Sequence, residues 1–113
     1  MSREVIFNYG DFTLVKENGI GMNNTPWEGL KVISDGLAED FVVAVRLERA
    51  GLAPYNGEPV KIKYTGNVAV AHGMRSRTET LTETAQYINV LTEALNFALR
   101  VERFLSENDE WTK

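Results

Sequence analysis

The sequence predicts an α+β fold: an antiparallel meander of short strands over about residues 4–71, with one long C-terminal helix, about 77–107, packed on one face. Two observations predict it. Short β-prone runs separated by turn residues fill the first two thirds of the chain, and the last third has the apolar period of a helix. Strands and helices do not alternate, so no parallel sheet of the strand–helix–strand kind is predicted.

The C-terminal segment is predicted to be helical because it contains two neighbouring apolar rows and no Gly or Pro between Thr78 and Ser106. The first row is formed by Tyr87, Val90, Ala94, Phe97, Val101 and Phe104. The second row lies about 100° around the axis and consists of Leu81, Thr84, Ile88, Leu91, Leu95, Ala98, Glu102 and Leu105. A third, polar row is a second candidate binding surface and holds Asn89, Glu93, Asn96, Arg100 and Arg103.

Two apolar rows form a wider stripe than a helix lying on one sheet needs. One interpretation is a helix sunk deep into its own sheet. The other is that one row packs on the sheet and the other on a second copy of the chain. We expect a homodimer through this helix, with the first row as its interface, because so short a chain has few other elements to cover a second face.

Turn residues divide the N-terminal third into strands. The turn residues 8–11 predict a hairpin between short runs at 5–7 and 12–15. Asn18-Gly19 is a strong two-residue hairpin signal and predicts that the strand from Phe12 folds back onto 20–22.

The middle of the chain is more ambiguous. Residues 23–29 are predicted to be a loop. Its Trp27 is more typical of a side chain that packs against the core than of one on which a ligand stacks. A short strand is expected at 30–33. Residues 38–50 alternate like a strand but have the length of a helix, and we favour the strand. The residues that follow, 51–59, are predicted to be a loop.

A half-buried strand is predicted at 60–64, where Val60, Ile62 and Tyr64 alternate with lysines. Thr65-Gly66-Asn67 is predicted to turn this strand back into a second one at 68–71.

Length and composition set limits on function. The 113 residues suit one domain, 1–113, with 107–113 as a frayed tail. There is no cysteine, so disulfides, thiolate zinc sites and thiol catalysis are excluded. The net charge of −4 disfavours general nucleic-acid binding. No apolar run is long enough for a membrane span and no signal peptide is visible, so we expect no membrane association and a cytoplasmic location.

Catalytic signatures are absent from the sequence. The single histidine, His72, excludes two-histidine metal motifs, and no serine lies in a nucleophile elbow. We therefore predict no catalytic residue, no metal site and no cofactor. An enzyme that uses His72 and a carboxylate as an acid–base pair is the least favoured hypothesis.

The sequence contains one local concentration of cations, expected where the last strand leads into the helix. Free N–H groups and the helix dipole favour an anion at such a place, and two arginines can grip a phosphate or carboxylate. The same arginines are also explained by pairing with nearby glutamates or by exposure to water. The candidate ligand-binding residues are Lys61, Lys63, His72, Arg75 and Arg77.

Two functions follow as expectations. The first is a non-enzymatic interaction protein, homodimeric through the C-terminal helix, that binds a protein partner. Small, acidic, cysteine-free chains of this kind are common among phage and mobile-element inhibitors. The alternative is a binder or sequestrant of a phosphate-bearing small molecule, such as a nucleotide, held by Arg75 and Arg77 at the N-terminus of the helix.

Overall fold

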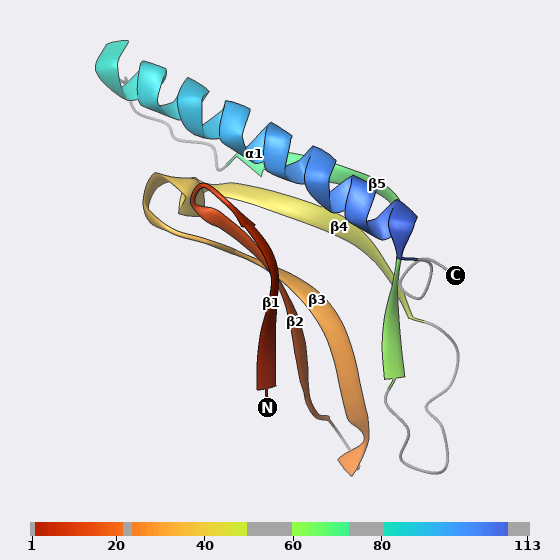
Figure 1. The fold of residues 1–113 in the computed structure, drawn as a ribbon. Coiled ribbons are helices and arrows are strands. Elements are labelled where there is room, and N and C mark those ends of the chain that lie inside the picture. Colours follow the sequence, from red (N-terminus) through yellow and green to blue (C-terminus); the bar gives the residue numbers. More distant parts are fainter. Residues whose placement is uncertain (1, 22–23, 50–59, 73–80, 109–113) are drawn as a thin grey trace.

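The computed structural model describes residues 2–21, 24–49, 60–72 and 81–108 of the chain and confirms the α+β fold. Strands form a curved sheet, and one long helix lies across it (Figure 1). In chain order the elements are β1 (Ser2–Tyr9), β2 (Phe12–Ile20), β3 (Pro26–Ser34), the short 3-10 helix η2 (Gly36–Asp40), β4 (Phe41–Arg49), β5 (Val60–His72) and α1 (Leu81–Glu107).

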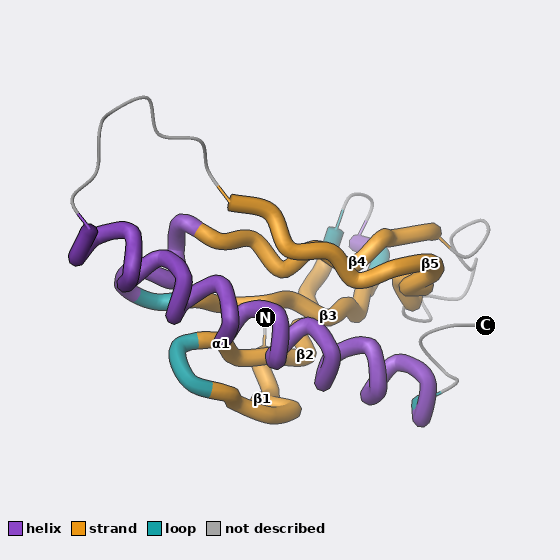
Figure 2. The backbone as a smooth tube through the Cα atoms, turned by 90° about the horizontal axis from the view of Figure 1, so that it is seen from above, coloured by secondary structure: helices purple, strands orange, loops and turns teal. Residues whose placement is uncertain are grey.

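The sheet consists of two antiparallel units. Strands β1, β2 and β3 form one unit, and β4 and β5 form the other. A short parallel pairing, Trp27 with Val60 and Glu28 with Lys61, joins β3 to β5. The strand order is therefore β1-β2-β3-β5-β4, which departs from a simple meander because β5 and not β4 lies beside β3. Seen from above, α1 crosses in front of the strands (Figure 2).

The first predicted hairpin is confirmed. Strand β1 ends at Tyr9 and β2 begins at Phe12, so the turn lies within the predicted residues 8–11. Gly10 has a φ of +59°, in the left-handed region that only glycine adopts readily. The side-chain amide of Asn8 donates hydrogen bonds across this turn to the carbonyl oxygens of Gly10 and Phe12.

The hairpin predicted at Asn18-Gly19 is wrong. Both residues lie inside the unbroken strand β2, where Gly19 is directly opposite Trp27 on β3. A Cβ at Gly19 would lie only 2.9 Å from the indole Nε1 of Trp27, so the glycine leaves room for the indole ring. Residues 26–29 are accordingly part of a strand and not the predicted loop, and Trp27 is a half-buried strand residue.

The strand interpretation of 38–50 is confirmed over Phe41–Arg49, after the turn of 3-10 helix η2. The turn predicted at Thr65-Gly66-Asn67 is wrong, because β5 continues through it. Val45 pairs with Val68 and Leu47 pairs with Tyr64, so residues 65–67 lie opposite the single residue between Val45 and Leu47. The extra residues make a bulge, which glycine accommodates easily.

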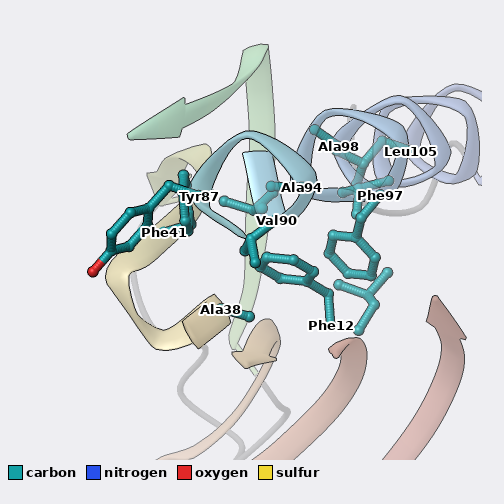
Figure 3. Packing of buried hydrophobic residues seen from close by; sticks show 12 residues of the cluster. Phe12, Ala38, Phe41, Tyr87, Val90, Ala94, Phe97, Ala98 and Leu105 are labelled. Atoms are coloured by element: carbon teal, nitrogen blue, oxygen red, sulfur yellow. The ribbon is translucent and has the colours of Figure 1, made fainter. Parts of the chain in front are cut away.

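The core lies between α1 and the inner faces of β2 and β4 (Figure 3). The ring of Phe97 on α1 stacks on that of Phe12, with centroids 5.4 Å apart, and also contacts the ring of Phe7 at 5.4 Å. Nearer the start of α1, Tyr87 packs against Phe41, and its hydroxyl donates a hydrogen bond to Asp40. These aromatic contacts fix which side of α1 faces the sheet.

No helix in the described part of the chain is both long and apolar enough to cross a membrane.

Candidate interaction surface on helix α1

The side chains of α1 divide into three faces, each separated from the next by about 110–125° around the helix axis. One face is buried on the sheet, one is apolar and exposed, and one is polar. An ordinary amphipathic helix has only the first and third of these. The apolar exposed face is therefore the feature of α1 that requires an explanation.

The buried face contains the whole first apolar row. Its members are in the chain's own core, and Ala94, Phe97 and Val101 are completely buried. This corrects the interface predicted from sequence, because a second copy cannot reach side chains that the sheet already covers. The six residues concerned, of which Phe104 is partly buried, are Tyr87, Val90, Ala94, Phe97, Val101 and Phe104.

The exposed apolar face includes only part of the second row, because Ala98 and Leu105 of that row are buried in the core. The exposed fractions are 58% for Ile88, 38% for Leu91, 51% for Leu95 and 63% for Leu99. We call these four residues the exposed row. They recur at intervals of three or four residues, so they form a continuous strip along the helix. Leu81, at the start of α1, continues the strip and is 91% exposed.

Leu99 belongs to neither of the two apolar rows predicted from the sequence. The signal was present, because Leu99 follows Leu95 by four residues, one helical turn. Exposed single leucines are normal on protein surfaces, but a contiguous apolar strip marks an interaction surface.

The polar face borders the exposed row and carries a pair of arginines. The guanidinium of Arg100 lies over the ring of Tyr9, 4.4 Å from its centroid, which holds this side chain against β1. Arg103 approaches Glu107 at 3.8 Å, with both side chains well exposed. Two shallow surface hollows, of about 290 and 330 Å³, are each lined by both arginines.

These hollows extend to either side of the arginine pair. One reaches Phe7 and Asn8 on β1, and the other reaches Asn96 and Leu99 on α1. The second hollow therefore touches the exposed row through Leu99. A partner that covers the exposed row would come within reach of Arg100 and Arg103, which can donate several hydrogen bonds each.

The predicted anion site is only partly described. Arg75 and Arg77 lie outside the described residues, so their role stays a prediction. His72 ends β5, whereas Lys61 and Lys63 lie near its start, and the unbroken strand separates them from His72 by roughly 30 Å. The prediction that the two lysines gather with His72 is wrong, because it depended on the turn at 65–67.

No group of three or more His, Cys, Asp or Glu side chains among the described residues could hold a metal ion. Comparison with known proteins adds no further assignment: no family model, curated protein or solved structure matches this chain.

Proposed function

We propose that this chain is a non-enzymatic interaction protein that forms a homodimer through the exposed row of α1 and acts by binding another protein. The observation that supports the proposal is that the exposed row, Ile88, Leu91, Leu95 and Leu99, remains at the surface although the first apolar row of the same helix is buried.

Physical chemistry supports a partner on this strip. Covering apolar side chains that are exposed to water lowers the free energy of the system. A regular apolar strip along a straight helix can pack against a second helix. A second copy of α1 offers a matching strip without any other component, and identical copies commonly associate about a two-fold axis.

The homodimer is tested with a variant that carries Ile88→Glu and Leu95→Glu. The wild type is expected to run as a dimer in light scattering at micromolar concentration, and the variant as a monomer. Both positions are exposed, so the far-UV circular dichroism should stay that of the wild type.

A matched control adds the same two charges to another face of α1. The variant with Gln86→Glu and Asn89→Glu changes two exposed residues away from the exposed row, and it should remain dimeric. A monomeric wild type, or an equal loss of dimer in both variants, would refute the proposal.

A further inference from the structure

We infer that two copies of α1 pair in antiparallel orientation, centred between Glu93 and Ala94, and that this pairing joins their polar rows into one continuous face. The inference rests on the proposed homodimer.

The exposed row is nearly symmetric about this centre. In an antiparallel pair, Ile88 of one copy lies level with Leu99 of the other, and Leu91 lies within one residue of the level of the partner copy's Leu95. Each of the four exposed side chains therefore meets an apolar side chain of the second copy. Leu81, which continues the strip at the start of α1, is not part of this symmetric set, because it lies level with the partner copy's Ser106.

The position of Glu102 distinguishes the two orientations. Glu102 follows Ile88 and Leu95 at intervals of seven residues, so it continues the same line along the helix. It is exposed. A parallel pair in register would place the two Glu102 carboxylates opposite each other, which is unfavourable. The antiparallel pair places Glu102 level with residue 85 of the second helix, so the two Glu102 carboxylates are about 25 Å apart along the axis.

The orientation also decides where the polar rows lie. In an antiparallel pair, the two-fold axis that relates the copies is perpendicular to the plane containing the two helices. Both polar rows therefore lie on one side of this plane, and both sheets lie on the other. In a parallel pair, the two-fold axis runs along the helices, and the two polar rows lie on opposite sides of the plane that contains the helices. Only the antiparallel dimer therefore has a single face with both copies of Asn96, Arg100 and Arg103.

This composite face gives the dimer a defined interaction surface. The two copies of Arg100 lie about 20 Å apart along the helix axes, at 1.5 Å per residue. Each is already held over the ring of Tyr9 in its own chain. A monomer carries only one of these arginine pairs, so the surface is incomplete without the second copy.

Disulfide crosslinking tests the orientation cleanly, because the chain has no cysteine of its own. Two single variants are made, Ile88→Cys and Leu99→Cys. In an antiparallel dimer, oxidation of a mixture of the two gives the mixed disulfide dimer. Either variant alone gives little disulfide-linked dimer, because the two copies of residue 88 are about 16 Å apart along the helix axes, which is too far for a disulfide.

The parallel arrangement predicts the reverse, in which each variant crosslinks with itself, and that result would overturn the inference. Val42→Cys is the control for random collision, since Val42 is exposed on β4 and its neighbours Phe41 and Val43 are buried in the core. Light scattering of the wild type separates the two proposals. A monomer refutes the homodimer itself, whereas a dimer with self-crosslinks refutes only the orientation.

A second variant keeps the test decisive if a cysteine weakens the dimer. Glu102→Gln removes the charge and keeps the shape. The dissociation constant of the antiparallel dimer should stay within about twofold of the wild type, because the two carboxylates are about 25 Å apart along the helix axes and screened by salt. A tighter dimer, as expected when two facing carboxylates are removed, would contradict the inference.

Discussion

The side-chain carboxylate of Glu93, on α1, accepts a hydrogen bond from the backbone N–H of Asp11, in the turn between β1 and β2. Gly10 makes this contact possible in two ways. Its φ of +59° shapes the turn, and a Cβ at this position would overlap the Glu93 carboxylate. The polar face of α1 thus includes one residue that ties the helix to the first hairpin.

We expect Gly10→Ala to lower the free energy of unfolding by more than the strain of a positive φ alone, which is about 1–2 kcal/mol. The additional loss comes from displacement of the Glu93 carboxylate. Gly36→Ala is the matched control, because Gly36 has a φ of +57° but open space around its Cβ position. Urea denaturation should show a clearly larger loss for Gly10→Ala.

A double-mutant cycle with Glu93→Ala separates the two causes. In the background that lacks the carboxylate, Gly10→Ala should cost no more than Gly36→Ala. Strict additivity of the two substitutions would show that the Glu93 contact does not restrict residue 10.

Gly19→Ala should displace the Trp27 ring, because the new Cβ would lie 2.9–3.0 Å from three atoms of the indole. The fluorescence emission of Trp27 is expected to change, measured in a Trp111→Phe background so that only one tryptophan emits. Gly21→Ala is the control: its Cβ would lie 3.6 Å from the same ring, an ordinary contact. Equal spectra for the two variants would argue against the close packing of Gly19 on Trp27.

Phe97→Ala should lower the free energy of unfolding by about 3–5 kcal/mol, because it leaves a cavity between α1 and β2. Phe97 is completely buried and contacts the rings of both Phe7 and Phe12. The neighbouring substitution Asn96→Ala is on the exposed side and should change stability by no more than about 0.5 kcal/mol. Denaturation at one fixed protein concentration checks both. A small loss for Phe97→Ala would mean that this part of the core repacks.

The anion hypothesis is tested by thermal unfolding with a nucleotide. If Arg75 and Arg77 hold a phosphate, a nucleoside triphosphate should raise the Tm of the wild type and not that of the variant with Arg75→Glu and Arg77→Glu. The variant with Lys61→Glu and Lys63→Glu carries the same charge change at the other end of β5 from His72, and it should respond like the wild type. No Tm increase in the wild type would eliminate this hypothesis for the nucleotide used.

Much of the fold could be predicted because its signals are local. The apolar period of α1 and the alternation of β4 are properties of consecutive residues, and each corresponds to one backbone geometry. The predicted end of the helix at 107 is also where α1 ends. The turn at Gly10 follows from the turn-favouring residues Asn8, Gly10 and Asp11, which are consecutive or nearly so in the sequence.

The errors arose where a local signal was outweighed by a distant contact. Asn18-Gly19 has turn chemistry, but β2 continues through it because Trp27 of β3 uses the space above Gly19. Residues 65–67 also resemble a turn, but the pairing of β5 with β4 absorbs them as a bulge. In both cases the deciding partner comes from another strand.

The sequence alone was sufficient to predict two apolar rows on α1, which together form a wider stripe than a helix lying on one sheet needs. Only the tertiary structure decided which apolar side chains of α1 the sheet covers: the first row, with Ala98 and Leu105 of the second. The rings of Phe7, Phe12 and Phe41 pack against Phe97 and Tyr87, so the row with the aromatic side chains is buried. Ile88, Leu91, Leu95 and Leu99 are left at the surface because the orientation of a helix depends on the shape of the opposite layer, which the helix's own sequence does not contain.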